Sequence, residues 1–153
     1  MSFDTPDGTR GGRQPGGGPI VRWLTKRMIK RIRRTGKAFG FNALVLTTIG
    51  RKSGVERTTP VGRFPGPDDS WLIVASAAGG ARNPAWYYNL GAHPDQVQIE
   101  FAGRTVPVKA EQLHGAEREE AWRKITAAAP RFTKYEEKTD RELPIVRLVA
   151  RSG

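Results

Sequence analysis

Residues 46–64, LTTIGRKSGVERTTPVGRF, place a tight basic turn between two strand-like runs. Glycines at both ends of this turn allow several backbone N–H groups to point at one ligand. Arginine and lysine side chains add fixed charge and donors, a combination that suits a phosphate or a carboxylate. A solvated surface turn is the alternative that these residues leave open. The anion-binding interpretation rests on Gly50, Arg51, Lys52, Ser53, Gly54 and Arg57.

A second stretch, VASAAGGARNPAWYYNL at residues 74–90, runs from a buried strand through a glycine-rich loop into a helix. Ser76 lies at the end of the strand, while Trp86, Tyr87 and Tyr88 fall in the first turns of the helix. Backbone that can bind an anion, next to a flat aromatic surface, favours a planar ligand with an acidic tail.

Other chemistries find little support in the composition. The chain contains no cysteine, which excludes disulfides, thiolate metal sites and cysteine nucleophiles. Its two histidines, His93 and His114, adjoin predicted turns and offer no pattern of metal ligands, so no metal site is expected. The carboxylates cluster on polar faces of predicted helices and form no pair that recommends itself as a general acid and base.

The net charge of +11 is concentrated near the N-terminus, because residues 1–40 hold ten of the 26 lysines and arginines but only two acidic residues. The rest of the chain is only mildly basic, which argues against nucleic acid as a partner. No run of about 18 apolar residues could span a bilayer, and no continuous apolar segment near the N-terminus resembles a secretory signal. We therefore expect a cytoplasmic protein.

Residues 1–19 are rich in glycine and proline and poor in apolar side chains, so a disordered tail is predicted there. Residues 20–39 follow with helical periodicity, one apolar face and one basic face. Such a helix lies on an anionic membrane surface or packs on the core of its own domain with a solvated basic face. Both alternatives stay open, and the first implies peripheral contact with the inner face of the membrane.

Beyond this helix, residues 40–151 are predicted to form one domain. Six apolar or alternating runs indicate strands at 43–49, 57–64, 71–77, 96–101, 104–113 and 143–150. Helices are predicted at residues 83–93, with Asn83 as the N-cap, and at residues 115–129. Pro60 places the second strand at an edge or a bulge. This order of elements favours a mainly β (α+β) fold, a small barrel with helices added.

Three segments resemble, in order and spacing, the deazaflavin (coenzyme F420)-dependent nitroreductase and quinone reductase family over about residues 40–150. They are TTIGRKSGVERTTPV, ASAAGGARNPAWYYNL with HPDQVQI after it, and YEEKTDRELPIVRL. The resemblance implies a split β-barrel of the flavin-reductase type, here preceded by the basic amphipathic helix. It also implies hydride transfer from reduced coenzyme F420, a deazaflavin with a phosphate and oligoglutamate tail, to an apolar acceptor. FMN is the less favoured cofactor.

The resemblance also implies a set of site residues. The acidic tail of the cofactor is expected along the basic turn and its ring beside the aromatic helix. The matching cofactor-binding positions are Arg51, Lys52, Ser53, Gly54, Arg57, Thr58, Thr59, Pro60, Ala75, Ser76, Ala77, Ala85, Trp86, Tyr87 and Asn89. Ser76 and Tyr135 match positions on the substrate side, which makes them the candidates for hydrogen bonding to the acceptor.

The predicted acceptor pocket departs from that of the best-known nitroreductase in the family. Ala77 stands where that relative has a lysine, and Gly62 stands where it has a tyrosine. Of the three tyrosines in its C-terminal lid only Tyr135 is kept, since Ala129 and Phe132 occupy the other two matching positions. Nitro reduction is therefore not carried over, whereas a quinone such as menaquinone suits a basic helix at a membrane. A split barrel that binds cofactor or lipid without turnover is the alternative.

Overall fold

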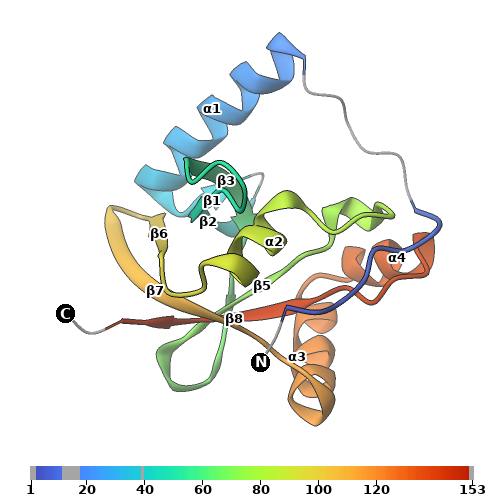
Figure 1. Ribbon diagram of the computed structural model, residues 1–153. Coiled ribbons are helices and arrows are strands. Elements are labelled where there is room, and N and C mark those ends of the chain that lie inside the picture. Colours follow the sequence, from blue (N-terminus) through green and yellow to red (C-terminus); the bar gives the residue numbers. More distant parts are fainter. Residues whose placement is uncertain (1–2, 12–17, 39, 152–153) are drawn as a thin grey trace.

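The computed structural model describes residues 3–11, 18–38 and 40–151 of the 153-residue chain (Figure 1). All six predicted strands are present, although their ends differ from the predicted ends by a few residues. Helix α4 and the two short strands β1 and β4 are additions that the sequence patterns do not predict. The elements in chain order are α1 (Pro19–Thr35), β1 (Lys37–Ala38), β2 (Phe41–Ile49), β3 (Glu56–Gly62), β4 (Phe64–Pro65), η1 (Pro67–Asp69), β5 (Trp71–Val74), η2 (Ala77–Gly79), α2 (Ala85–Ala92), β6 (Val97–Phe101), β7 (Arg104–Gln112), α3 (Gly115–Ala128), α4 (Arg131–Lys138) and β8 (Ile145–Ala150).

The strands form one curled antiparallel sheet in the order β1-β2-β6-β7-β8-β5-β4, with β3 paired to β2 beside this path. Strand β2 is central, because Val45 lies opposite Pro60 of β3 on one side and opposite Glu100 of β6 on the other. Among the described strands β3 pairs only with β2, so Pro60 lies on an edge, as predicted for a residue without a backbone N–H. The curled sheet is a half-barrel, which confirms the predicted α+β barrel.

Most of strand β5 and the start of β8 are buried on both faces, which explains their apolar sequences there. Ile73 and Val146 pack into the barrel interior with residues of β2 and α1. Leu72, Val74 and Ile145 point to the other face and pack with α3 and α4. These two helices therefore lie on the outer face of the sheet (Figure 1), and α4 also contacts η2, the turn that follows β5.

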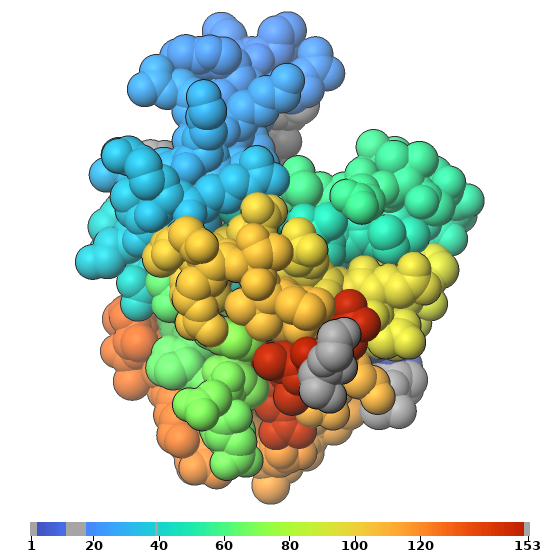
Figure 2. Space-filling model, turned by 90° about the vertical axis from the view of Figure 1, so that its left-hand side faces the viewer, coloured from blue at the N-terminus to red at the C-terminus, as the bar shows by residue number. Residues whose placement is uncertain are grey.

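Helix α1 ends at a glycine cap before the predicted end at residue 39. Gly36 has a left-handed backbone (φ 75°), and its N–H donates to the carbonyl oxygen of Ile32 (2.8 Å). The Ile32 side chain is fully buried on the sheet, whereas Trp23 and Leu24 are 55% and 51% exposed. Figure 2 shows the N-terminal half of α1 standing out from the body. No described helix has the length and apolar character needed to cross a bilayer.

Residues 3–11 differ from the disordered tail predicted for residues 1–19, because they lie along the body of the protein. Thr5 is buried, and its backbone N–H donates to the Tyr87 hydroxyl (3.0 Å). The carboxylate of Asp140 accepts two further backbone N–H groups of this segment (2.7 and 3.1 Å). Hydrogen bonds to distant residues therefore hold the segment, and composition carries no signal of such bonds. Residues 1–2 and 12–17 of the predicted tail lie outside the described residues.

Candidate functional site

The predicted basic turn forms the tip of the β2–β3 hairpin. Gly54 has a left-handed backbone (φ 71°), and its N–H donates to the carbonyl oxygen of Gly50 (3.0 Å). A Cβ atom at Gly50 would lie 2.4 Å from the Ser53 Oγ, so a side chain at this position would require the Ser53 hydroxyl to move. Arg51 and Lys52 are exposed at the tip. The glycines therefore shape the turn, and the two basic side chains give it its charge.

Asn89 of α2 fastens this hairpin tip to the body of the protein. Its side-chain oxygen accepts the backbone N–H of Arg51 (2.9 Å), and its amide donates to the Thr48 Oγ1 (3.1 Å). The side chain is buried, so water competes little for either bond. The Arg51 guanidinium also lies 4.9 Å from the centroid of the Tyr88 ring. Asn89 thus positions the basic turn against the aromatic helix.

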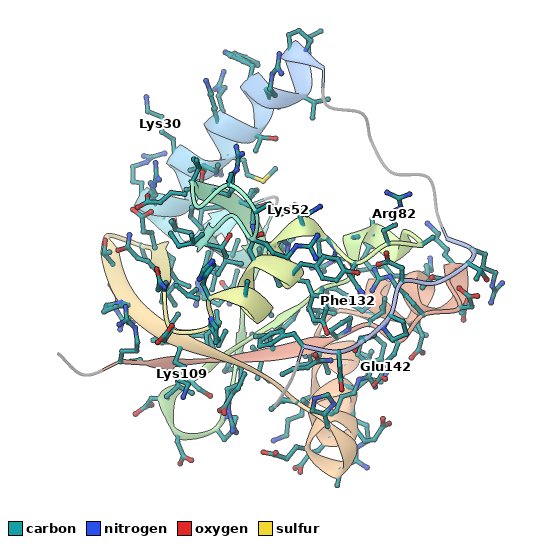
Figure 3. All side chains as sticks on the ribbon, viewed as in Figure 1. Lys30, Lys52, Arg82, Lys109, Phe132 and Glu142 are labelled. Carbon is teal, nitrogen blue, oxygen red and sulfur yellow. The ribbon has the colours of Figure 1, made fainter. Side chains whose placement is uncertain are left out.

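An open pocket of about 1000 Å³, here called the basic pocket, is bordered by the hairpin tip, the loop before α2 and the N-terminal segment. Figure 3 shows Lys52 of the hairpin and Arg82 of the loop extending toward the same side of the molecule. Four cationic side chains line the pocket, and none forms an ion pair with a described residue. Such a lining suits a polyanion. Its residues are Asp7, Thr48, Gly50, Arg51, Lys52, Ser53, Arg57, Thr59, Arg82, Asn83, Pro84, Ala85, Trp86, Tyr88 and Asn89.

Asp7 is the carboxylate among these residues, and its charge is already partnered. Its Oδ1 accepts the Tyr88 hydroxyl (2.6 Å) and the backbone N–H of Asn83 (2.9 Å). These two hydrogen bonds, with a smaller contribution from the charge of Arg82, hold the pKa of Asp7 below its ordinary value. Burial, and then the hydrogen bond to Asp7, raise the pKa of Tyr88. Asp7 therefore fixes the N-terminal segment at the edge of the basic pocket.

The loop after β5 has a left-handed backbone conformation, which residues with a side chain rarely adopt. Ala77, Ala78 and Gly79 have φ angles of 47°, 52° and 80°. Left-handed backbone costs roughly 1 kcal/mol or more for a residue with a Cβ, so neighbouring groups must hold this loop in place. A Cβ atom at Gly79 would lie 2.9 Å from the Tyr135 carbonyl oxygen, which shows how closely α4 packs on the loop. Because the chain turns here, the strand predicted to reach residue 77 ends at Val74.

Arg141 holds the same loop from the interior of the protein. Its guanidinium donates hydrogen bonds of less than 3 Å to four oxygens, the carbonyls of Ala75 (2.9 Å), Ser76 (2.7 Å) and Gly80 (2.9 Å) and the side chain of Asn83 (2.8 Å). Burial lowers the pKa of Arg141, yet a guanidinium keeps its charge in proteins. The Asn83 side chain thus accepts a hydrogen bond from Arg141. Asn83 is not the N-cap that the sequence predicts, since Pro84 occupies that position.

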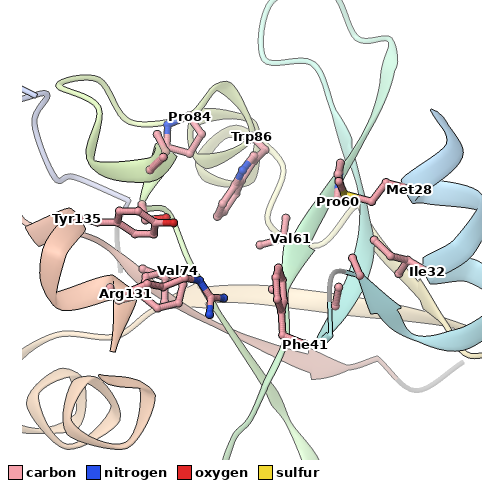
Figure 4. Close-up of a pocket in the computed structure, with 17 residues that line it drawn as sticks. Met28, Ile32, Phe41, Pro60, Val61, Val74, Pro84, Trp86, Arg131 and Tyr135 are labelled. Carbon is pink, nitrogen blue, oxygen red and sulfur yellow. The ribbon is translucent and has the colours of Figure 1, made fainter. Parts of the chain in front are cut away.

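A second cavity, of about 350 Å³, lies between α1, β3, the loop after β5 and α4, and is here called the apolar cavity. Figure 4 shows Met28 of α1 and Tyr135 of α4 on opposite sides, with Trp86 between them. Among the described residues, no carboxylate lines it, and the one cationic side chain is that of Arg131. The lining residues are Met28, Ile32, Ala38, Phe41, Ala43, Pro60, Val61, Gly62, Val74, Ser76, Ala77, Ala78, Pro84, Trp86, Arg131, Phe132 and Tyr135.

Two hydroxyl groups belong to residues that line the apolar cavity, those of Ser76 and Tyr135. Neither hydroxyl forms a hydrogen bond with a described residue, although the Ser76 carbonyl oxygen accepts from Arg141. The Tyr135 ring packs edge-on against Phe132, with 5.5 Å between ring centroids. Both hydroxyls are therefore available to a ligand in the cavity.

The two cavities are neighbours, because Pro84 and Trp86 line both. A basic lining and an apolar lining therefore adjoin the same two residues. In the described part of the chain, no group of three or more His, Asp or Glu side chains could hold a metal ion.

Most of the predicted site residues line one of the two cavities. In the basic pocket these are Arg51, Lys52, Ser53, Arg57, Thr59, Ala85, Trp86 and Asn89. In the apolar cavity they are Pro60, Ser76, Ala77, Trp86 and Tyr135. The predicted residues that line neither are Gly54, Thr58, Ala75 and Tyr87. Tyr87 requires a correction, because it is fully buried and its hydroxyl donates to Gln112 (2.6 Å), so its ring belongs to the core.

Sequence patterns miss four residues that shape the site: Asp7, Arg82, Arg131 and Arg141. Asp7 falls in the segment predicted to be disordered, and composition gives no signal for it. Arg131 and Arg141 fall in the stretch RFTKYEEKTDRELP. The spacing of three residues between Phe132 and Tyr135 is helical and could have indicated α4.

The curled sheet and its adjoining cavities define a cofactor-binding split barrel of the flavin-reductase type. Residues 21–150 match the family described as F420H(2)-dependent quinone reductase. An F420H(2)-dependent quinone reductase of Mycobacterium tuberculosis is 37% identical over 112 residues, which cover 71% of this chain and 74% of the relative.

Two solved structures agree with this assignment. An F420-H2 dependent reductase matches with a TM-score of 0.62 and 34% identity, over 69% of this chain and 92% of that chain. A structure described as a domain-swapped dimer matches with a TM-score of 0.63 and 31% identity, over 84% of this chain and 96% of that chain. The chain belongs to the F420H(2)-dependent quinone reductase family. It is an oxidoreductase, and its cofactor is reduced coenzyme F420, as the sequence predicts.

Proposed function

We propose that the protein transfers a hydride from reduced coenzyme F420 to a quinone, with menaquinone as the natural example. The observation that carries this proposal is the pair of unlike cavities that share Pro84 and Trp86. The basic pocket suits a tail whose phosphate and glutamate groups are all negative. The apolar cavity suits a planar acceptor made mostly of hydrocarbon.

Cofactor binding is assigned to the hairpin tip and the aromatic helix. Arg51, Lys52 and Arg57 offer charge-assisted hydrogen bonds to the acidic tail, and Arg82 adds a fourth cation from the loop before α2. Trp86, which lines both cavities, offers a flat apolar face to the deazaflavin ring. The donors and their charges thus fit the cofactor that the family uses.

When bound, the reduced deazaflavin supplies the hydride, and the chain itself orients the acceptor. We assign to the hydroxyls of Ser76 and Tyr135 the hydrogen bonds to the acceptor oxygens, because both line the apolar cavity without a partner among the described residues. Phe132, which packs on Tyr135, helps to keep water from this end of the cavity.

Turnover tests this proposal. Purified protein is mixed with reduced coenzyme F420 and menadione, and cofactor reoxidation is followed by absorbance. We expect reoxidation that far exceeds the protein-free rate and saturates with menadione. Tyr135→Phe should lower kcat/KM about tenfold or more, because a hydrogen bond to the reacting oxygen is lost. Thr133→Ala, on the exposed side of the same helix, is the matched control. Reoxidation at the protein-free rate with every quinone, while the cofactor still binds, would favour a barrel that binds without turnover.

We also propose that the N-terminal half of α1 contacts an anionic membrane surface. Ile20, Trp23 and Leu24 are more than half exposed, and basic side chains flank them on the same helix. Co-sedimentation with phosphatidylglycerol vesicles tests this contact. Leu24→Glu should abolish it, whereas Val149→Glu, at an exposed apolar position on β8, should leave it unchanged. Equal co-sedimentation of both variants would rule out docking through α1.

A further inference from the structure

Arg131, the first residue of α4, places a guanidinium in the wall of the apolar cavity. Its Cζ lies 4.4 Å from the centroid of the Phe41 ring and 4.8 Å from that of Phe132. Figure 4 shows the group extending from α4 toward Phe41. Contact with two aromatic rings limits the orientation of a planar cation, and it leaves the N–H donors at the edge of the group for other partners.

This guanidinium differs from those of the other arginines in the interior. Arg141 donates to four protein oxygens, and Arg118 binds the Leu143 carbonyl and the Glu142 carboxylate. Arg131, by contrast, forms no hydrogen bond or ion pair with any residue that the structure describes. A half-buried cation without a counter-ion is unfavourable, so negative charge brought by a ligand would be stabilising there.

The surroundings of Arg131 separate it from the binding of the acidic tail. It does not line the basic pocket, which has four cations of its own. Gly62 of β3 lies beside it, since a Cβ atom at Gly62 would be in ordinary van der Waals contact with the Arg131 Nη2, at 3.8 Å. The charge belongs to the acceptor end of the site.

We propose that Arg131 makes the apolar cavity prefer planar acceptors that carry an acidic oxygen on the ring, such as a quinone with an ionised hydroxyl or a carboxylate, while neutral quinones such as menaquinone bind there more weakly. This inference rests on the proposed function, because it names the class of acceptor for the same cavity. The guanidinium can hold two adjacent oxygens at once when one is charged. A neutral quinone of the same shape offers only carbonyl oxygens, which are weaker acceptors for a cation.

The test compares two naphthoquinones of nearly equal shape. Lawsone carries a ring hydroxyl that is ionised at neutral pH, and menadione carries a methyl group in its place. Dissociation constants are measured by calorimetry on the full chain, with and without oxidised coenzyme F420, so that no reduction takes place. Arg131→Met and Arg131→Gln remove the charge, Arg131→Lys keeps it, and Lys134→Met removes a charge from the exposed side of the same helix.

We expect the wild-type protein to bind lawsone more tightly than menadione. The ratio of the menadione dissociation constant to the lawsone dissociation constant should fall about tenfold in both uncharged variants. It should fall less in Arg131→Lys and stay unchanged in Lys134→Met. Unfolding midpoints show which variants are folded, and either folded uncharged variant is sufficient for the comparison.

Several results would overturn the inference. They are an unchanged ratio in the uncharged variants, an equal fall in Lys134→Met, or no binding of either quinone to the wild-type protein. Weaker binding of coenzyme F420 at an unchanged ratio would assign Arg131 to the cofactor instead. Failure of hydride transfer to every quinone, with the Arg131-dependent preference intact, would remove the proposed function and leave this inference standing.

Discussion

The basic pocket and the apolar cavity share Trp86 but are built in opposite ways. The basic pocket relies on exposed charges at a hairpin tip, and the buried amide of Asn89 ties that tip to α2. The apolar cavity takes its walls from α1, β3 and α4, and Arg141 holds the adjoining loop through four protein oxygens.

This difference indicates how each end of the site responds to change. Exposed charges act over several ångströms and tolerate small shifts, so binding at the basic pocket should depend on ionic strength and on the number of charges. Packed walls act through shape, so a small displacement alters what fits in the apolar cavity. We therefore expect the basic pocket to tolerate small changes, and the apolar cavity to respond to a single substitution.

The largest effect is expected at Arg141. Arg141→Met leaves buried carbonyl oxygens of the loop without donors, which should lower the free energy of unfolding by about 3 kcal/mol. Urea denaturation measures this change. Arg22→Met, at an exposed position on α1, is the control and should behave as the wild type. Wild-type stability of Arg141→Met would show that the loop does not depend on this guanidinium.

The next effect tests the tolerance of the basic pocket. Replacing Arg51 and Lys52 by alanine should weaken binding of coenzyme F420 about tenfold at low salt, and less at high salt, because screening reduces the charge contribution. Fluorescence titration with the tailed cofactor and with the deazaflavin that lacks the tail measures the difference. Replacing Lys26 and Lys30 by alanine removes the same charge from α1 and should change neither affinity. An equal loss for both ligands would argue against tail binding at the hairpin.

A smaller effect is expected when the hairpin keeps its charges but loses its tie to α2. Asn89→Ala removes both side-chain hydrogen bonds and should weaken binding of coenzyme F420 severalfold, since the Arg51 backbone is no longer held. Asn42→Ala, at an exposed position on the same strand as Thr48, serves as the control. Unaltered affinity in Asn89→Ala would mean that the charges alone determine binding.

The smallest effect concerns pH and the N-terminal segment that brings Asp7 to the basic pocket. Hydrogen bonds, first from the Thr9 side chain and then from the backbone N–H groups of Arg10 and Thr9, lower the pKa of Asp140 from 3.8 to about 2. Because the pKa is depressed in the folded state, this stabilisation is present above about pH 4 and is lost as the pH falls toward about 2. Hydrogen exchange at the Thr9 amide should accelerate over that range relative to a core amide. In Asp140→Asn this pH-dependent acceleration of exchange should be absent. If it persists in that variant, a titrating group other than Asp140 causes it.

The sequence predicts the two ends of the site unequally, for a physical reason. The basic turn and the strands are encoded by neighbours in the chain, where turn chemistry and alternation act locally. The roles of Arg131 and Arg141 depend on Phe41 and on the loop after β5, which only the fold brings near them. The N-terminal segment is a similar case, because its composition favours disorder while Asp140, far along the chain, fastens it. Local patterns therefore indicate the basic turn and the strands, whereas the positions of Arg131, Arg141 and the N-terminal segment become visible only in the fold.

The most direct test of this account is the structure of the protein with coenzyme F420 bound. We predict tail oxygens within salt-bridge distance of Arg51, Lys52 or Arg57, and the deazaflavin ring against Trp86. A tail bound elsewhere, with the hairpin tip in contact only with solvent, would contradict the account.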